Sequence, residues 1–265
     1  MKKCLSVFGL SFKMQIVWRF DVIMTMVATV GRILAAWILW QAIFSGHTTV
    51  KGFSLRAMLS YYILSSILCS IDFSNQVSGE VSELIRSGRF SGHMVRPMNP
   101  LGFFGSIIAG ESAFHLGFSI LAALICAAVF RISINFNGDF ARIALALAII
   151  PIGLMFMACY HFFVGILTFK FLEIGFFMHI QGCIIAFVTG SLVPLSLLPG
   201  SVLAALRFFP FTHVVYTPVM LLCGQAGAAE GLFALANLSL WTTAMLAIAQ
   251  YTYRHLRVKY DGVGI

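Results

Sequence analysis

Long apolar stretches, separated by short polar segments, set the pattern of this chain. A membrane-spanning helix needs about 20 mainly apolar residues. Stretches that qualify run over residues 22–44, 58–77, 101–130, 143–168, 176–198 and 232–253. The pattern therefore predicts an all-α integral membrane protein with six transmembrane helices.

Residues 199–227 are apolar enough to enter lipid, but they fit poorly into one spanning helix. Arg207, Pro210, His213 and Pro218 interrupt the stretch, and proline breaks helix interiors. A seventh full span would also place the basic C-terminus on the side opposite the N-terminus. We expect two half-helices that enter the membrane from outside and return, sheltered by the other spans.

The N-terminal residues 1–20 predict a helix that lies in the membrane interface. Leu5, Phe8 and Phe12 fall on one side of a helix, whereas Lys2 and Lys13 lie elsewhere, the pattern of an interfacial helix. The apolar run is short, Lys13 interrupts it, and no small-residue cleavage site follows. We therefore do not expect a signal peptide.

Composition excludes an ordinary soluble domain. The chain is 60% hydrophobic and 10% charged, whereas soluble domains carry roughly 25% charged residues. Lys and Arg number 17 against 9 acidic residues. This excess does not predict nucleic-acid binding, because membrane proteins concentrate Lys and Arg in cytoplasmic loops. The expected environment is the lipid bilayer.

The distribution of the basic residues predicts the orientation. If the N-terminus is cytoplasmic, the cytoplasmic segments hold Lys2, Lys3, Lys13, Arg19, Arg86, Arg89, Arg96, Lys170, Arg254, Arg257 and Lys259. The opposite side holds only Lys51, Arg56, Arg131, Arg142 and Arg207. Both termini are therefore expected in the cytoplasm.

The segment 79–100 is the most polar interruption between two apolar stretches. Its charged residues are Glu80, Glu83, Arg86, Arg89 and Arg96. We predict a short helix over 81–85, ended by Gly88 and followed by a basic turn that Pro97 keeps from becoming helical. An ordered element of this kind favours a docking surface. The alternative is a basic anchor that touches anionic lipid.

The sequence lacks the local patterns of a catalytic or metal site. It has no GxxxxGK[ST], HExxH or GxSxG motif, and its six cysteines are spread singly, which predicts neither a disulfide framework nor a zinc site. We expect no enzyme activity and no cofactor bound by this chain. His115, His161 and His179 each lie alone in an apolar stretch, where hydrogen-bonded core histidines are the favoured interpretation.

Three ionisable residues fall within the predicted spans: Arg32, Asp72 and Glu111. A charged residue at the centre of a spanning helix costs roughly 2.5–3.5 kcal/mol on insertion scales. The favoured interpretation is a structural pair of Arg32 with one of the two carboxylates. The alternative is a polar substrate path or a proton relay.

Two blocks of the chain carry a recognisable pattern. The first consists of Ile85, Gly88, Phe90, Met94, Arg96, Pro97, Met98 and Pro100. It resembles the loop between spans two and three in the permeases of bacterial ABC-type-2 transporters. The second resembles the family's fifth span and following outer hairpin and is carried by Gly190, Pro194, Pro199, Pro210, Phe211, Tyr216 and Pro218. His93, with Ser91 and Gly92 before it, departs from the apolar residues that many relatives have there.

The resemblance implies one permease domain over residues 1–265 in the bacterial inner membrane, with a cytoplasmic coupling helix between spans two and three and an outer re-entrant hairpin between spans five and six. It also implies a homodimer, or a heterodimer with a sister permease, and a separate ATP-binding subunit that holds ATP and Mg²⁺. The residues expected to couple to that subunit are Glu80, Glu83, Ile85, Arg86, Gly88, Arg96 and Pro97.

The function implied by the resemblance is export of a hydrophobic or amphipathic compound, such as a drug, an antibiotic or a lipid. The alternative is a self-contained channel or a membrane scaffold without an ATPase. A channel should show polar stripes along several spans, whereas the sequence shows only scattered single charges.

Overall fold

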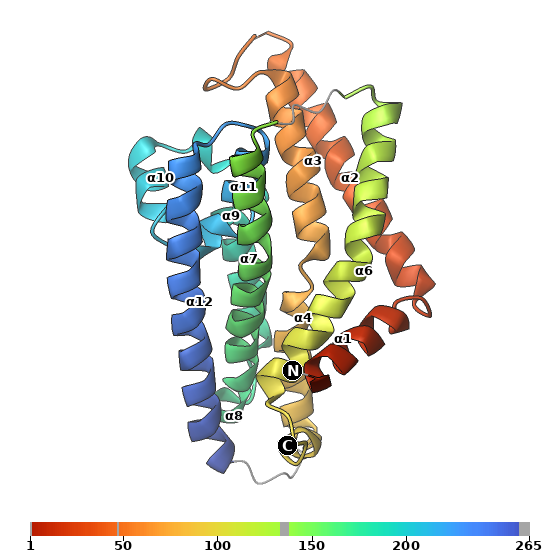
Figure 1. Ribbon diagram of the computed structural model, residues 1–265, viewed down its shortest axis with the longest axis vertical. Helices are drawn as coiled ribbons and strands as arrows, with labels where there is room; N and C mark the ends of the chain where they lie inside the picture. Colours follow the sequence, from red (N-terminus) through yellow and green to blue (C-terminus); the bar gives the residue numbers. More distant parts are fainter. Residues whose placement is uncertain (1, 47, 133–137, 260–265) are drawn as a thin grey trace.

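The computed structural model describes residues 2–46, 48–132 and 138–259. Long helices stand side by side along the long axis of the molecule (Figure 1). Every regular element in this part of the chain is helical, and the one β-bridge joins Val50 to Phe53 in the loop after the first long helix. The fold is that of an all-α integral membrane protein.

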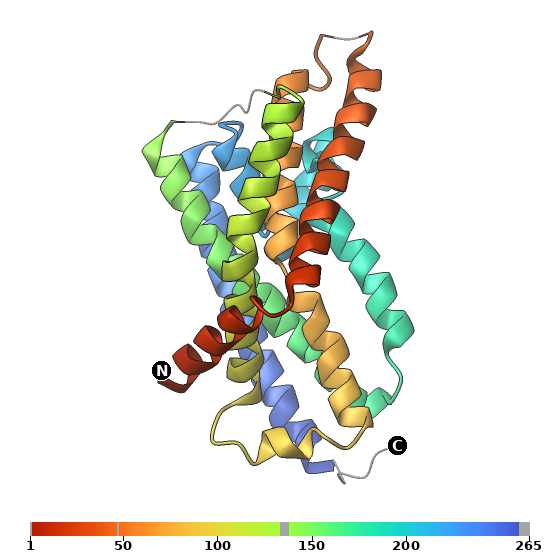
Figure 2. The same cartoon turned by 90° about the vertical axis from the view of Figure 1, so that its right-hand side faces the viewer.

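The N-terminal helix α1 (Lys2–Met14) lies across the flank of the bundle, and a turn leads from it into α2 (Arg19–Phe44) (Figure 2). Helix α1 packs against the long helix α6 (Pro100–Val129). A Cβ atom on Gly110 would lie only 2.6 Å from the Phe8 carbonyl oxygen. The absence of a side chain at Gly110 therefore allows α1 to pack this closely on α6.

The second predicted span differs most from the structure. Instead of one helix over 58–77, α3 (Leu55–Ile71) ends at Asp72, and a new helix, α4 (Ser74–Arg86), begins after Phe73. Apolar periodicity did not reveal the break. The polar part of α4 therefore continues the second span, and the predicted short helix over 81–85 is its last portion.

A one-turn helix, α5 (Ser91–Met94), interrupts the turn between α4 and α6. Gly88 has φ +73°, a left-handed conformation that favours glycine at this helix end. The side chain of Asn99 accepts a hydrogen bond from the Leu101 N–H, and Pro100 occupies the first turn of α6, where its missing N–H costs nothing.

The helices α7 (Phe140–Ile166) and α12 (Ala228–Leu256) run together and form the second half of the bundle (Figure 1). The short α8 (Thr168–Phe171) follows α7, and a 3₁₀ turn (Arg257–Lys259) follows α12. Helix α4 packs against α7, whereas α3 packs against α2 and α6. The break at Asp72 thus separates two groups of helices.

The predicted fifth span is shorter in the structure than in the sequence interpretation. Helix α9 covers only Gly175–Val188, 14 residues or about 21 Å, against the roughly 30 Å of a bilayer core. Two residues after its end the chain turns at Gly190, which has φ +78°. Hydroxyl groups from α3 bind the chain there: Tyr61 donates to the Gly190 carbonyl at 2.7 Å, and Tyr62 to that of Leu192 at 2.9 Å.

The segment after α9 is broken, as predicted. It contains a 3₁₀ turn (Leu195–Leu197), α10 (Gly200–Leu206), a second 3₁₀ turn (Pro210–His213) and α11 (Tyr216–Leu222). The part that ends in α11 is bent by 90° relative to α10. All seven residues of α11 are buried, so neighbouring helices shelter the irregular backbone.

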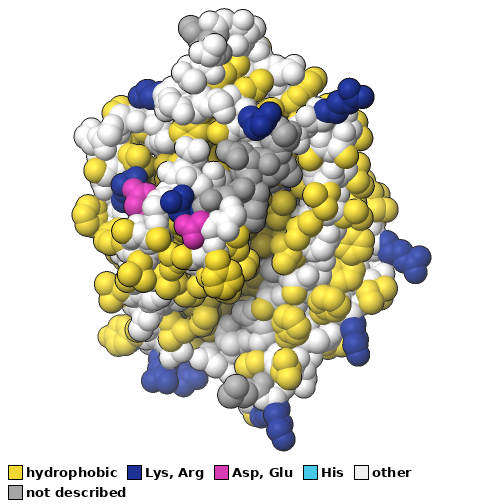
Figure 3. Space-filling view, turned by 45° about the horizontal axis from the view of Figure 1, so that its top comes forward, with side chains coloured by type: hydrophobic (Ala, Val, Ile, Leu, Met, Phe, Trp, Pro, Cys, Tyr) yellow, Lys and Arg dark blue, Asp and Glu magenta, His cyan; other side chains and the backbone are white. Residues whose placement is uncertain are grey.

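Within the described residues, five helical stretches are long and apolar enough to cross a membrane, or six if the bent pair is one span. Apolar side chains cover the flank between the two ends of the molecule (Figure 3). The segments expected in the cytoplasm, namely the α4–α6 turn, α8 and the end of α12, gather at one end (Figure 1). This distribution of side chains is that of a multi-pass membrane protein.

Candidate functional site: the α4–α6 turn and an intramembrane cavity

A buried phenylalanine anchors the turn between α4 and α6. Phe90 is 0% exposed. Its ring lies 5.4 Å from that of Phe169 and 6.1 Å from that of Tyr253, measured between centroids. The turn is thereby attached to α8 and to the end of α12.

The inner face of α4 is packed and unavailable to a partner. A Cβ atom on Gly165 of α7 would lie 2.8 Å from the Val81 Cβ. Ser82 accepts a hydrogen bond from the Thr168 hydroxyl at 2.9 Å. Ile85 is 3% exposed. The expectation that Ile85 contacts a partner is therefore corrected: its position fits packing against the core.

Charged side chains occupy the outer face of α4 and the start of the turn. Arg86 pairs with Glu173 at 2.7 Å, and Arg89 lies 3.7 Å from Glu83. All four side chains are about half or more exposed, and such exposed pairs contribute only about 0–1 kcal/mol each. Glu80 is also exposed. These groups can exchange partners at little cost in free energy.

The far side of the turn contacts both α6 and α1. The Arg96 guanidinium lies over the Phe103 ring, 4.9 Å from its centroid. The Lys3 ammonium donates to the Pro97 carbonyl at 3.0 Å. Val95, next to Arg96, is 83% exposed. The turn is therefore held from three sides and exposes a mixed basic and apolar tip.

His93 lies inside the turn among aromatic rings. Its ring is 5.2 Å from Phe103 and 5.5 Å from Phe104, measured between centroids. Partial burial and the nearby Arg96 charge lower the pKa of His93 below its ordinary value. The neutral ring is therefore the form that this packing favours.

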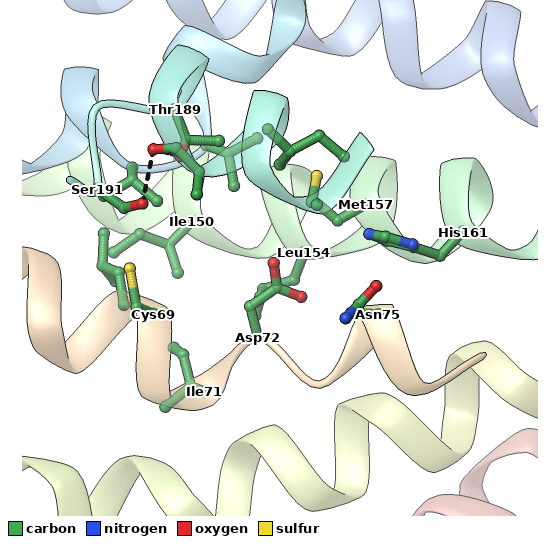
Figure 4. Close-up of a pocket in the computed structure, with 16 residues that line it drawn as sticks. Cys69, Ile71, Asp72, Asn75, Ile150, Leu154, Met157, His161, Thr189 and Ser191 are labelled. Atoms are coloured by element: carbon green, nitrogen blue, oxygen red, sulfur yellow. Dashed lines mark hydrogen bonds between the residues drawn. The ribbon is translucent and has the colours of Figure 1, made fainter. Parts of the chain in front are cut away.

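A cavity of about 170 Å³ lies at the α3–α4 break, between α7, α9 and the chain that follows α9 (Figure 4). Its polar lining includes Asp72, Asn75 and His161. The apolar lining includes Leu154 and Met157 of α7. These residues come from separate parts of the chain, so their spacing in the sequence did not predict the cavity.

Asp72 supplies the acidic group of this cavity. Its Oδ1 accepts a hydrogen bond from the Ser74 N–H at 3.0 Å and another from the Ser74 hydroxyl. Among the described residues, no Lys or Arg lies within salt-bridge distance of Asp72. The expected pair of Arg32 with Asp72 or Glu111 is absent. The side chain of Arg32 is exposed on the surface of α2 instead.

Glu111 borders a separate cavity of about 410 Å³ beside the α1–α2 turn, together with Gln15, Trp18, Asp21 and His115. The His115 Nε2 lies 3.2 Å from the Gln15 Oε1. His115 is thus a buried, hydrogen-bonded histidine, as expected.

The expectation of a hydrogen-bonded core histidine is wrong for His161 and His179. His179 is exposed on α9. His161 is 2% exposed, and no hydrogen bond to its ring occurs in the described parts of the chain. His161 lines the cavity at the α3–α4 break.

In the bent segment, the prolines and the tyrosine expected in the outer hairpin lie at the starts of helices and 3₁₀ turns. Pro194 and Pro199 precede the 3₁₀ turn and α10, Pro210 begins the second 3₁₀ turn, and Tyr216 and Pro218 lie in the first turn of α11. A proline is tolerated in a first turn, so Pro218 does not break α11. The Tyr216 N–H donates to the Thr189 carbonyl at 3.1 Å, which ties α11 to the end of α9.

The described residues contain no group of three or more His, Cys, Asp or Glu side chains that could hold a metal ion. Several apolar helices, a polar turn at one end and a small cavity between helices are the features of a multi-pass membrane protein. The model of a family described as "ABC-2 family transporter protein" matches residues 30–264. The chain belongs to this family and is a permease subunit of an ABC transporter, a class that works with an ABC ATP-binding partner. No curated protein and no solved structure gives a significant match.

Proposed function

We propose that this permease exports a hydrophobic or amphipathic compound across the bacterial inner membrane. A separate subunit that binds ATP and Mg²⁺ drives the export. The permease acts as a dimer, either with itself or with a sister chain, and both its termini lie in the cytoplasm. ATP hydrolysis takes place on the partner, so this chain provides the path and the docking surface.

The α4–α6 turn is the proposed docking surface. Glu80, Glu83 and Arg86 lie on the outer face of α4, and Gly88 turns the chain toward the basic tip at Arg96 and Pro97. The observation that carries this proposal is the combination of an exposed charged surface with a buried anchor. Phe90 attaches the turn to α8 and α12, and α4 packs on α7.

This arrangement gives movement of the partner a direct route into the membrane. A push on a slack loop would be absorbed by the loop. A push on the anchored turn moves α4 and α6 with it, because both helices begin or end there. Closure of the ATP-binding subunits would thereby shift the helices that line the path.

Copurification tests the proposal. The tagged full-length chain is purified in mild detergent from its native membrane, and associated proteins are identified by mass spectrometry. We expect an ATP-binding subunit with a phosphate-binding loop. The Arg86→Glu variant, and separately Glu83→Arg, should reduce recovery of that subunit and its ATPase stimulation at unchanged membrane insertion.

A matched control is Arg56→Glu, which reverses an exposed charge at the opposite end of the molecule, in the first turn of α3. It should leave recovery of the ATP-binding subunit unchanged. If no ATP-binding subunit accompanies the native chain, the self-contained channel or scaffold becomes the better explanation. If Arg56→Glu and Arg86→Glu reduce recovery of the ATP-binding subunit equally, the α4–α6 turn is not the docking surface.

A further inference from the structure

The cavity at the α3–α4 break combines an unpaired acidic group with apolar walls. Asp72 lies where the backbone is not helical, and its carboxylate faces the cavity (Figure 4). Asp72 is half-buried, and shielding a carboxylate from water without a cation partner is unfavourable, because the surrounding low dielectric stabilises its charge poorly. The described chain supplies hydrogen bonds from Ser74 but no Lys or Arg.

Two further polar groups face the same space. The amide of Asn75 and the ring of His161 point toward the Asp72 side of the cavity (Figure 4). His161 is almost fully buried, and its ring forms no hydrogen bond within the described residues. A neutral imidazole has one acceptor nitrogen, an amide has one acceptor oxygen, and a carboxylate accepts through both oxygens. The cavity therefore offers three different acceptor groups.

This set of acceptors matches the donors of an ammonium group. A primary ammonium carries a positive charge and three N–H donors. It would satisfy the Asp72 charge and place remaining donors toward His161 and Asn75. A metal ion fits less well, because no group of three His, Cys, Asp or Glu residues exists in the described parts of the chain.

The size of the cavity limits what enters with the ammonium. An engineered apolar cavity of about 150 Å³ holds one benzene molecule. The observed 170 Å³ accommodates a small head group and a few neighbouring carbons. Leu154, Met157 and Ile150 supply apolar contacts for those carbons. Met is flexible enough to adapt to different shapes.

We propose that this cavity binds the amine end of a cationic amphipathic substrate, with Asp72 as the ion-pair partner and Asn75 and His161 as hydrogen-bond acceptors. The proposal rests on the proposed export function and specifies its substrate class. It assigns to Asp72 a role in recognising the substrate, in place of the expected structural pair with Arg32.

The test measures binding of dodecylamine to the full-length chain in lipid nanodiscs, through the shift of its Tm. Dodecanol, of equal chain length and without charge, corrects for partition into the lipid. We expect dodecylamine to raise the Tm above the effect of dodecanol. In Asp72→Asn the concentration for half of that shift should rise about 10- to 100-fold, as expected for loss of a charged hydrogen-bond partner.

Asn can still accept the hydrogen bond from the Ser74 N–H, so Asp72→Asn should preserve the start of α4. The Tm without ligand checks this. Asn75→Ala, at an exposed position, provides a second variant and should weaken dodecylamine binding by up to about 10-fold. Asp21→Asn, in the separate cavity beside the α1–α2 turn, is the control and should bind as the native chain does.

Equal Tm shifts with dodecylamine and dodecanol would overturn the proposal. So would equal dodecylamine binding by the native chain and by Asp72→Asn. Copurification of the ATP-binding subunit with Asp72→Asn, carried out in parallel, distinguishes the two proposals. A chain that keeps this subunit but does not prefer the amine retains the export function and loses only the substrate assignment.

Discussion

The α4–α6 turn and the bent segment after α9 are both irregular, but they are stabilised in opposite ways. The turn is anchored mainly by Phe90 and leaves its charges and the tip at Val95 exposed. In the bent segment, hydroxyl groups of Tyr61 and Tyr62 satisfy backbone carbonyls, and α11 is entirely buried.

The difference follows from the surroundings of each segment. Backbone groups in a bilayer must find protein partners, because lipid offers none. A segment at the polar end of the molecule can leave such groups to water. The α4–α6 turn therefore has free surface for a partner, whereas the bent segment uses backbone carbonyl groups for hydrogen bonds within the fold.

The largest expected effect comes from removing the anchor of the turn. Phe90→Ala should lower the free energy of unfolding by about 3–5 kcal/mol, the usual cost of emptying a fully buried phenylalanine site. Unfolding by SDS in mixed micelles measures it. Val95→Ala, in the same turn at an exposed position, should change stability by no more than about 0.5 kcal/mol. Similar losses for both would mean that Phe90 is not the anchor.

The next effect tests the backbone of the bent segment. Gly190→Ala places a Cβ atom at a position with φ +78°, 2.9 Å from the Tyr61 hydroxyl. The backbone strain alone should cost about 1–3 kcal/mol. The Tm in detergent measures the loss. Gly182→Ala, on α9 with open space around it, should be neutral or stabilising by up to about 1 kcal/mol. A stable Gly190→Ala would contradict the observed geometry.

A smaller effect is expected from one hydrogen bond. Tyr61→Phe removes the hydroxyl that donates to the Gly190 carbonyl and should cost about 1–2 kcal/mol. The same change at Tyr251, which is 74% exposed, should leave the Tm unchanged. If the two substitutions have the same effect, the carbonyl at Gly190 has found another partner.

The smallest expected effect on stability comes from His93 in the α4–α6 turn, and it depends on pH. Because the pKa of His93 is lowered in the folded chain, the unfolded chain takes up the proton first as the pH falls below about 6.5. His93 therefore contributes to loss of stability on acidification through this range and has no such effect above it. His93→Gln should show a flatter decline in Tm between pH 7 and pH 5. An identical pH profile in both chains would exclude this contribution.

Hydropathy predicted the helical class, the long helices α2, α6, α7 and α12, and the broken segment after α9, because these features depend on runs of apolar residues and on proline. It failed at Asp72. A single acidic residue in an apolar stretch gives no local sign of whether the helix continues. The break arises where α3 leaves the α2 and α6 packing and α4 begins to pack on α7.

The candidate sites were predictable to different degrees. The exposed charges at Glu83 and Arg86 follow from a polar stretch between apolar ones. The burial of Ile85 depends on the packing of α4 against α7, a helix far away in the sequence, which no local pattern reports. The cavity likewise requires Asp72 and His161 to meet across two helices. In the sequence, the only sign of this cavity was a single acidic residue, Asp72, within a predicted span. Only the structure shows that Asp72 lacks a cation partner among the described residues.

The two-residue break at Asp72 also has a geometric consequence for the far end of α4. The helix has 13 residues and is about 20 Å long. A change of only 10° in its direction at Asp72 would displace its Arg86 end by about 3 Å, given that rise per residue. A head group bound as proposed would lie at the point about which α4 turns. A small rearrangement around the Asp72 carboxylate would then become a larger displacement at the Arg86 end, where the proposed partner binds.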